Sequence, residues 1–368
     1  PDHLVCGGVC VDPGTDPVHC GGCDASCTGW PASEGGVCEG GTCVLACAAG
    51  ADDCNGALAD GCETDLDTDR FHCGACGNVC GALCGDGACL SVALGDVALG
   101  HVCAHLGDGS VYCWGNNAEG QLADGTTIAR SAPVRVPISG VTALATGPFH
   151  TCARTIEGEA WCWGRNDAGQ LGTGGTAPVA APVAVLDGGQ PLRGVVELAL
   201  TDASTCALLE SGRVKCWGSG AHGRLGDGAA VDRLEPDWVT VAGSPLEGVA
   251  GIAAGLEHVC ARMVDGTVRC WGSGTYGRLG VGDELGRLEP ALVPGLAGVD
   301  EIAAAGWRSC ARSGGTVHCW GTNAQGQVGD GMPGSARLLP SPVAGLTDAI
   351  SLHLGQNHGF AQIGRAHV

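Results

Sequence analysis

The sequence has few basic residues, few tyrosines and phenylalanines, and no long apolar run. Only one of its 18 basic side chains is a lysine, against 39 aspartates and glutamates, and the 368 residues include two Tyr and three Phe. The formal charge of −21 repels phosphate backbones and anionic membrane surfaces, so we expect no nucleic-acid partner. No stretch approaches the roughly 18 consecutive apolar residues of a membrane-spanning helix.

Long stretches with helical periodicity are also missing, as are the motifs of common catalytic sites. No Ser-His-Asp order, paired-carboxylate signature or phosphate-binding loop occurs. We therefore predict no catalytic residue, no metal ligand and no cofactor. What the chain has in abundance is glycine, 67 residues without the period of collagen, which is typical of a turn-rich, all-β protein.

Twenty-five cysteines in regular spacing indicate disulfides formed in an oxidising compartment. Their density changes near residue 90, because residues 1–90 hold 15 cysteines and a net charge of −13, whereas the rest of the chain holds 10. We predict a Cys-rich module over residues 1–90 and a repeat region over residues 91–362. The excess of Arg over Lys, together with abundant Ala, Gly and Val, is typical of a GC-rich bacterial genome.

The Cys-rich module contains an internal duplication, with copies at about residues 1–46 and 47–90. Both copies carry Asp-x-x-His-Cys-Gly-x-Cys, at residues 16–23 and 69–76. Disulfides are the favoured interpretation because so small a core needs covalent support, and their connectivity stays open. The alternative is zinc binding by the Cys-x-x-Cys pairs Cys20/Cys23 and Cys73/Cys76.

Residues 91–362 repeat with a period of about fifty residues, and each of the five complete repeats carries a cysteine followed, after a turn, by Cys-Trp-Gly. The first cysteines are Cys103, Cys152, Cys206, Cys260 and Cys310, with Phe360 in the sixth place. The Cys-Trp-Gly tryptophans, which we expect to pack between repeats, are Trp114, Trp163, Trp217, Trp271 and Trp320.

A turn signal such as Asp265-Gly266 lies midway between the two cysteines of each repeat and predicts a β-hairpin. The spacing places the two sulfurs opposite one another on adjacent antiparallel strands, within disulfide range. Each disulfide would close a loop of about ten residues and contribute about 2–3 kcal/mol. The five predicted pairs are Cys103 with Cys113, Cys152 with Cys162, Cys206 with Cys216, Cys260 with Cys270, and Cys310 with Cys319.

Each hairpin is preceded by a short apolar strand, such as residues 195–200, and followed by a glycine-rich bend and a proline-flanked strand, such as residues 182–186. Four short strands in fifty residues are typical of a β-propeller blade. The repeats resemble the RCC1 repeat, whose blades read His-x-Cys-Ala, Asp-Gly-x-Val-x-Cys-Trp-Gly-x-Asn and then Gly-Gln-Leu-Gly. Residues 101–122 match almost in full, while two later repeats carry Arg224 and Arg278 for Gln.

The resemblance implies an RCC1-like β-propeller, which in this family has seven blades. The sequence supplies five complete repeats and half of a sixth, which we interpret as a truncated ring. Residues 363–368 read like a translated sequencing adapter, and we predict an artefact there. The first residue is not Met and copy one has one cysteine fewer than copy two, so we expect a signal peptide upstream of residue 1, with a lipoprotein anchor as a further possibility.

Several periodic polar side chains have structural interpretations. Histidines two residues before the first cysteine are expected to hydrogen-bond neighbouring backbone, because a residue that recurs in equivalent places is usually structural. Aspartates in the glycine-rich bends are expected to make turn hydrogen bonds. The histidines are His101, His150 and His258, and the aspartates are Asp124, Asp227, Asp283 and Asp330.

The resemblance suggests two classes of function. The favoured one is an extracellular or outer-surface scaffold that presents propeller loops to an unidentified protein partner, as bacterial secreted members of the family do. Its candidate binding rim consists of Trp161, Trp238 and Trp307. The alternative is a secreted propeller enzyme, a glycosidase or lyase, which needs non-periodic carboxylates about 5–10 Å apart in the central channel. The exchange of nucleotide on a small GTPase, known for the name-giving member, is not expected of an acidic, oxidised chain.

Overall fold

The computed structural model describes residues 100–364 throughout and, before them, only short strands. These strands are β1 (Leu4–Cys6), β2 (Val9–Val11), β3 (Gly36–Glu39), β4 (Thr42–Leu45), β5 (Ala51–Asp52), β6 (Thr64–Asp65), β7 (Leu83–Gly85), β8 (Ala88–Leu90) and β9 (Val92–Leu94). The chain divides into two compact units: residues 1–92 with 106–108, and residues 93–105 with 109–368.

In the first unit, the strand pairs β3–β4 and β7–β8 are equivalent antiparallel hairpins. Their registers place Cys38 opposite Cys43 and Cys84 opposite Cys89. These cysteines correspond to one another in the two predicted copies, and Cys38 is buried and disulfide-bonded. The module's boundaries and its other disulfides stay predictions.

Two sequence-based interpretations concern residues that the structure does not describe. The zinc alternative falls on Cys20, Cys23, Cys73 and Cys76, and the predicted artefact falls mostly on residues 365–368; both lie outside the described residues.

The described part of the second unit contains five four-stranded antiparallel sheets, a two-stranded sheet at its C-terminal end and two further two-stranded hairpins. We call each four-stranded sheet and the C-terminal two-stranded sheet a blade, number the blades 1 to 6 in chain order, and name the strands of each blade A to D in chain order. The blades are β9, β10 (His101–Leu106), β11 (Val111–Gly115) and β12 (Arg130–Val136); β13 (Val141–Thr146), β14 (His150–Thr155), β15 (Ala160–Gly164) and β16 (Val179–Ala184); β19 (Val195–Leu200), β20 (Ser204–Leu209), β21 (Val214–Gly218) and β22 (Arg233–Trp238); β25 (Val249–Ala254), β26 (His258–Met263), β27 (Val268–Gly272) and β28 (Arg287–Leu292); β29 (Glu301–Ala305), β30 (Arg308–Ser313), β31 (Thr316–Gly321) and β32 (Arg337–Pro342); and β33 (Ala349–Leu354) with β34 (Gly359–Ile363). The predicted all-β propeller architecture is confirmed.

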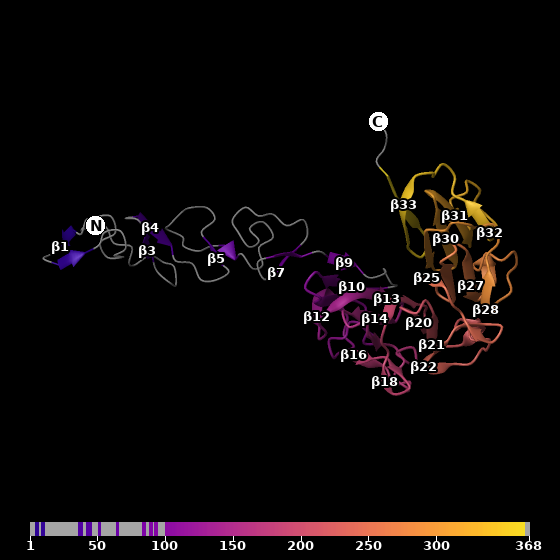
Figure 1. Ribbon diagram of the computed structural model, residues 1–368, viewed down its shortest axis with the longest axis horizontal. Coiled ribbons are helices and arrows are strands. Elements are labelled where there is room, and N and C mark those ends of the chain that lie inside the picture. The colour runs from indigo at the N-terminus through magenta and orange to yellow at the C-terminus, as the bar shows by residue number, and fades with distance from the viewer. Residues whose placement is uncertain are drawn as a thin grey trace. The chain divides into compact units, whose positions relative to one another are not determined.

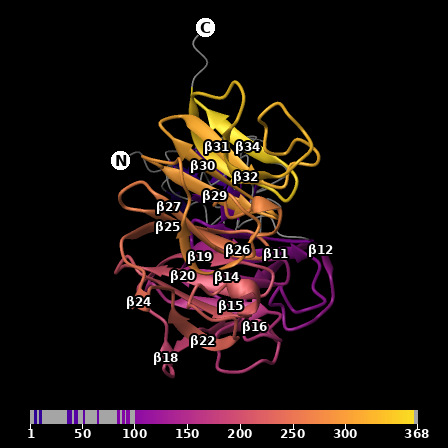
Figure 2. The same cartoon turned by 90° about the vertical axis from the view of Figure 1, so that its right-hand side faces the viewer.

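The blades follow one another around an arc (Figure 1). A strands of neighbouring blades contact each other: β13 with β19, β19 with β25, β25 with β29, and β29 with β33. The A strands β19, β25 and β29 are labelled in Figure 2. Because successive strands are antiparallel, the A–B and C–D connections share one end of each blade, here called the AB–CD end. The B–C turns and the connections to the next blade form the opposite BC–DA end. Two small hairpins extend the BC–DA end, β17 (Leu186–Asp187) with β18 (Gln190–Pro191) and β23 (Thr240–Val241) with β24 (Ser244–Pro245).

The described helical segments are two single turns at the AB–CD end, η1 (Ala221–Gly223) and η2 (Thr275–Gly277). No helix among the described residues has the length and apolar character needed to cross a membrane.

The cysteines pair as the spacing predicted. In each of the five four-stranded blades the two cysteines face each other on strands B and C, for example Cys206 opposite Cys216, and the structure contains all five disulfides. Their Cα atoms lie 4.1–4.2 Å apart, as in non-hydrogen-bonded antiparallel pairs. All ten of these cysteines are buried, so each disulfide joins the hairpin inside the core.

The glycine of Cys-Trp-Gly is required by the backbone. Gly164 and its four counterparts have φ between 96° and 107°, and a Cβ atom at each would collide with the carbonyl oxygen at the A–B connection, in this case that of Phe149. The C–D ladder also shifts register between the cysteine and this glycine in all five four-stranded blades, as a β-bulge does. The glycine thus lets strand C end close beneath the A–B connection.

Four of the five Cys-Trp-Gly tryptophans pack between adjacent blades, as predicted. Trp163, Trp217, Trp271 and Trp320 are completely buried. Each indole Nε1–H donates to a carbonyl oxygen of the preceding blade at 2.9–3.0 Å, such as that of Gln170 for Trp217. Trp114, in the first blade, is only half-buried.

The bend aspartates make the predicted turn hydrogen bonds and, in addition, an ion pair. Asp227 accepts a hydrogen bond from the backbone N–H of Ala229 and pairs with Arg233, the first residue of strand D, at 2.7 Å. Asp124, Asp283 and Asp330 pair in the same way with Arg130, Arg287 and Arg337. Blade 2 has Thr173 and Val179 at these two positions, so the aspartate and the arginine are replaced together.

Replacing Asp227 with Asn is expected to lower the free energy of unfolding by about 1–2 kcal/mol, because the buried carboxylate loses a charge-assisted bond to Arg233. Guanidinium denaturation of the oxidised full chain measures this loss. The matched variant Asp283→Asn should cost less, because the carboxylate of Asp283 is 40% exposed against 5% for Asp227. Equal effects of the two substitutions would contradict this ranking.

Blades 3 and 4 share the segment Arg-Leu-Glu-Pro, at residues 233–236 and 287–290, which contacts the preceding blade. Leu288 packs against Gly223 of the preceding blade, and Glu289 accepts hydrogen bonds from Thr240 and from the N–H of Ala242 in the β23–β24 hairpin. In blade 3, Glu235 likewise accepts from the N–H of Gly188. The segment is therefore an inter-blade contact.

Candidate functional site

The periodic histidines lie in buried inter-blade networks. His101, His150 and His258 place Nε2 2.7–2.9 Å from a hydroxyl of the next blade, that of Thr151, Thr205 or Ser309 respectively. This hydroxyl donates in turn to a backbone carbonyl that also accepts a tryptophan indole N–H. The expected direct bond to backbone is thus wrong in detail, because a hydroxyl is interposed.

The networks fix the protonation state of these histidines. Since the hydroxyl proton points to the carbonyl, Nε2 must carry the imidazole proton, and Nδ1 is buried without a hydrogen-bond partner. Burial lowers the pKa of His101 to about 4 and the pKa values of His150 and His258 to about 3. Neutral, enclosed imidazoles of this kind serve the packing of blades and present no group to a ligand.

Several side chains at the AB–CD end differ from those at the equivalent positions of the other blades. In blade 2, Arg165 follows Cys-Trp-Gly, lies over the ring of Phe149 at 5.2 Å and forms an ion pair with Asp167. The carboxylate of Asp167 has a pKa below its usual range because Arg165 donates a hydrogen bond to it. This group is an aromatic ring covered by a paired guanidinium.

Blades 3 and 4 carry a row of alternating charges beside it. Arg224 pairs with Asp202, and its guanidinium also lies 3.9 Å from Glu257, which pairs with Arg278 at 2.9 Å. The guanidinium groups are buried, with exposures of 5% and 2%, whereas the carboxylates of Asp202 and Glu257 are 35% and 31% exposed. Burial raises the pKa of Asp202, and it lowers the pKa of Arg278. The row therefore presents carboxylate oxygens to solvent.

An exposed aromatic pair continues the row. Tyr276 and Trp307 are 45% and 43% exposed, and their ring centroids lie 5.8 Å apart. The guanidinium of Arg278 lies 6.0 Å from the Tyr276 ring, which connects the pair to Glu257. Tyr276 and its blade 3 counterpart His222 have φ of 62° and 59°, a left-handed conformation that costs energy for side chains other than glycine.

The three predicted rim tryptophans do not form one site. Trp307 lies in the A–B connection of blade 5, at the AB–CD end. Trp161 donates to Glu159 in a B–C turn, and Trp238 contacts Lys215 at 4.5 Å, which is itself bonded to Asp187; both tryptophans are half-buried at the BC–DA end. The reason is that Trp161 and Trp238 occupy strands C and D, where neighbouring side chains cover them.

Carboxylates do occur on the A strands, as the enzyme alternative requires, but they are engaged in structural contacts. Glu197 accepts a hydrogen bond from the N–H of Ile252, and Glu301 accepts one from the N–H of Leu352, each in the next blade. Glu301 also pairs with Arg312 at 3.0 Å. These acids connect A strands across blade boundaries.

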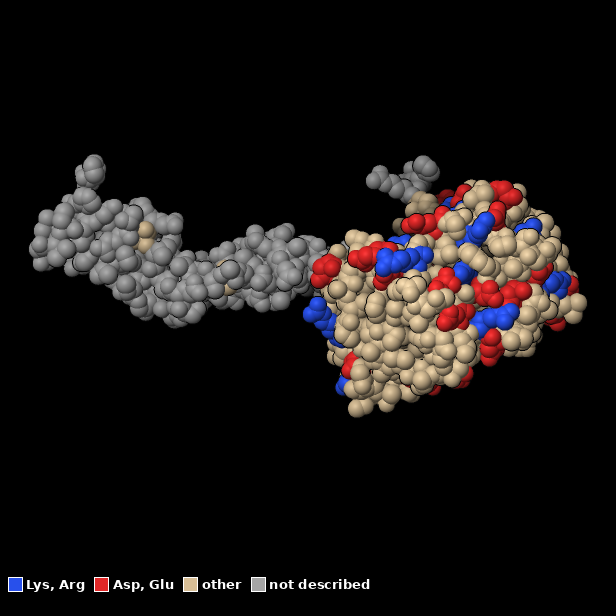
Figure 3. All heavy atoms as spheres, turned by 60° about the horizontal axis from the view of Figure 1, so that its bottom comes forward, with Lys and Arg blue, Asp and Glu red and all other residues tan. Residues whose placement is uncertain are grey.

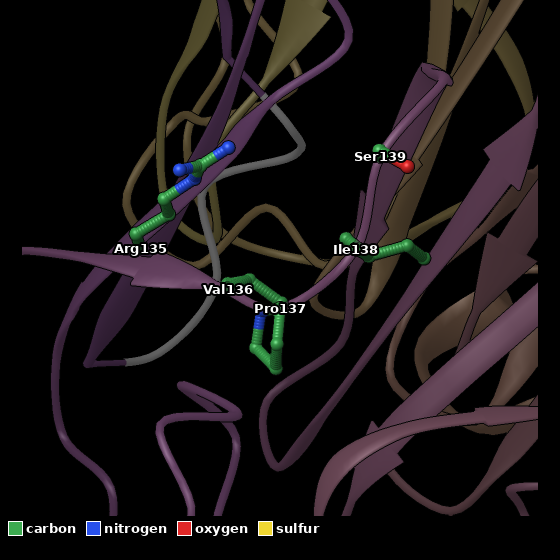
Figure 4. Close-up of a pocket in the computed structure, with 5 residues that line it drawn as sticks. All are labelled: Arg135, Val136, Pro137, Ile138 and Ser139. Atoms are coloured by element: carbon green, nitrogen blue, oxygen red, sulfur yellow. The ribbon is translucent and has the colours of Figure 1, made fainter.

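A surface hollow beside β12 has no catalytic constellation either. It measures about 430 Å³ and is lined by residues 135–139, between β12 and β13. Its polar side chains, Arg135 and Ser139, lie on opposite sides (Figure 4), and its lining contains no carboxylate or histidine. Within the described part of the chain, no group of three or more His, Cys, Asp and Glu side chains could hold a metal ion.

Sequence reasoning missed Tyr276, Phe149 and the charged row. The available signal was departure from the repeat: blades 3 and 4 read Ser-Gly-x-x-Gly-Arg where the other three read Asn-x-x-Gly-Gln. The acids Asp202 and Glu257 occur in those same two blades, facing the substituted arginines. Aromatic residues in the A–B connections, Phe149 and Trp307, were a second signal.

Several known proteins are similar to this chain. The family model for the RCC1-like domain matches residues 85–361. The chain is 39% identical over 101 residues, 27% of its length, to the E3 ubiquitin-protein ligase HERC2 of Homo sapiens, of which it covers 2%. It is 30% identical over 196 residues, 48% of its length, to the secretion-regulating guanine nucleotide exchange factor of Bos taurus, of which it covers 42%.

Among solved structures, yeast RCC1 (Prp20) bound to Kap60 shares the fold, with a TM-score of 0.64 and 23% identity over 74% of this chain and 68% of that one. The chain spans less than half the length of both curated relatives.

Proposed function

The chain belongs to the RCC1-like domain family, and from this membership we propose that it is a non-catalytic scaffold that binds a protein partner through the AB–CD end of its blades. The observation that carries the proposal is the contact between two exposed rings, Tyr276 and Trp307, beside the charged row. Tyrosine, tryptophan and arginine are the residues that most often dominate binding energy in protein interfaces.

The rigidity of the blades supports the same proposal. Disulfides, buried tryptophans and histidine networks connect the strands and blades beneath the AB–CD end. A face held in this way loses little conformational entropy on binding, which favours affinity. In its own structure the yeast relative with this fold is bound to another protein, Kap60.

We place the scaffold outside the cell or on the outer surface of a bacterium. A disulfide in each of the five four-stranded blades favours an oxidising compartment, as does the disulfide at Cys38. Acidic side chains are interspersed with arginines on the propeller face shown in Figure 3, without a broad basic patch there. Nucleotide exchange and nucleic-acid binding therefore form no part of the proposal.

Replacing Trp307 with alanine is expected to weaken partner binding by about 10- to 100-fold, as loss of an interface hot spot does. The oxidised full chain, immobilised, selects partners from culture medium and cell-surface extract, and calorimetry with a purified partner then gives Kd. Trp161→Ala, at the BC–DA end, is the control and should change Kd less than twofold.

Loss of affinity in the Trp161 variant but not in the Trp307 variant would move the interface to the opposite end. Failure to find any saturable protein ligand, together with cleavage of glycosidic bonds by the purified chain, would replace the scaffold with the enzyme alternative.

A further inference from the structure

In blade 2, an aromatic ring at the AB–CD end is covered by a cationic side chain of the same blade. In blade 2 the ring of Phe149 lies beneath the guanidinium of Arg165, which Asp167 holds by an ion pair. The ring, the cation and the carboxylate come from the A–B connection and from the first and third residues after Cys-Trp-Gly.

Blade 5 has the same backbone at this place but lacks the cover. The N–H of Arg165 donates to the carbonyl of Phe149 at 3.0 Å, and the N–H of Thr322 donates to the carbonyl of Trp307 at 3.0 Å, so the positions are equivalent. Thr322 and Ala324 replace the arginine and the aspartate. Trp307 is accordingly 43% exposed, whereas Phe149 is half-buried.

The neighbouring A–B connection, in blade 4, nevertheless carries a carboxylate. The N–H of Leu256 donates to the carbonyl of Gly306 at 3.0 Å, which brings the connection that carries Glu257 against the one that carries Trp307. The carboxylate of Glu257 is 31% exposed and pairs with the buried guanidinium of Arg278 at 2.9 Å. Tyr276 adds a second ring at 5.8 Å from Trp307.

We propose that Trp307, Tyr276 and Glu257 bind an arginine side chain of the partner protein, which takes the place that Arg165 occupies over Phe149. This inference rests on the proposed function. A guanidinium fits better than an ammonium because it is planar, stacks on aromatic faces and bonds a carboxylate with two N–H groups. The strained Tyr276 holds its ring at the edge of this site.

The test places an arginine of this chain in the proposed site, where it would compete with the arginine of a partner. The double variant T322R/A324D transplants the cover of blade 2 into blade 5, and T322S/A324S is its matched control. The full chain, labelled with ¹⁵N at its tryptophan indoles, is titrated with acetyl-Gly-Arg-Gly amide and with the corresponding lysine and citrulline peptides. The Trp307 signal is assigned by its loss in W307F.

The proposal predicts a saturable shift of the Trp307 signal with the arginine peptide, at least threefold weaker binding of the lysine peptide, and no response to citrulline. The shift should vanish in T322R/A324D and persist in T322S/A324S. An unresponsive Trp307, equal responses to arginine and lysine, or a response that survives T322R/A324D would overturn the proposal.

The same variants separate this inference from the scaffold function. A partner that binds the wild-type chain and T322R/A324D equally well would leave the scaffold standing and overturn the arginine site. A Trp307 response to the arginine peptide in a chain for which no protein partner is found would support the site and count against the scaffold.

Discussion

The variant Trp217→Ala is expected to lose about 4 kcal/mol of unfolding free energy, the range found for large aromatic residues removed from a core. Trp217 is completely buried between blades 2 and 3, and its indole N–H donates to the carbonyl of Gln170 at 3.0 Å. Truncation opens a cavity at this boundary and removes that bond. Scanning calorimetry of the oxidised full chain should show a fall in Tm on the order of 10 °C.

Trp161→Ala is the matched comparison for loss of a tryptophan side chain. Trp161 also lies on strand C, immediately before a Cys-Trp-Gly segment, but it is only half-buried. Trp161→Ala should cost less than half as much as Trp217→Ala. A loss below about 1 kcal/mol for Trp217→Ala would show that the ring does not hold the two blades together.

Acidification from pH 7 to pH 5 is expected to destabilise the second unit by about 2 kcal/mol for each of His101, His150 and His258. Their folded-state pKa values of about 4, 3 and 3 lie below the ordinary value of 6.5. The unfolded chain therefore binds more protons in this window. The stability is fully present above about pH 6.5 and is lost progressively as the pH falls toward 4 and 3.

Guanidinium denaturation at pH 7, 6 and 5 measures this slope, and replacement of all three histidines by glutamine is the control. Glutamine can still donate an N–H to the hydroxyl of the next blade but does not titrate. The slope should largely disappear in the triple variant. An unchanged slope would show that these three histidines do not cause the acid sensitivity. Asp202 cannot cause it either, because a carboxyl pKa that burial raises favours folding as the pH falls.

Repetition made most of the fold predictable. The two cysteines of each repeat define facing positions on strands B and C, and the turn between them fixes the register, so the pairing of Cys206 with Cys216 followed from spacing. The inter-blade place of Trp217 followed from its recurrence. The role of Glu289 did not, because a single repeat contains no information on which atoms of the preceding blade its side chain meets.

The candidate site was less predictable for the same reason. Trp161, Trp238 and Trp307 look alike in the sequence, yet strands C and D cover the first two while an A–B connection exposes the third. Pairs of interacting positions that both differ from the other repeats were more informative than the tryptophans. Ser204 replaces a histidine and Val259 replaces its hydroxyl partner at one blade boundary, just as Arg224 and Asp202 appear together nearby.

The central claim is that repeated side chains hold the blades together while the exceptions at the AB–CD end bind the partner. Hydrogen–deuterium exchange of the full chain, with and without a captured partner, tests it most directly. The account predicts protection confined to the connections around residues 255–257, 274–278 and 305–307. Protection at the BC–DA end, around residues 156–161 and 210–215, with none near Trp307, would contradict it.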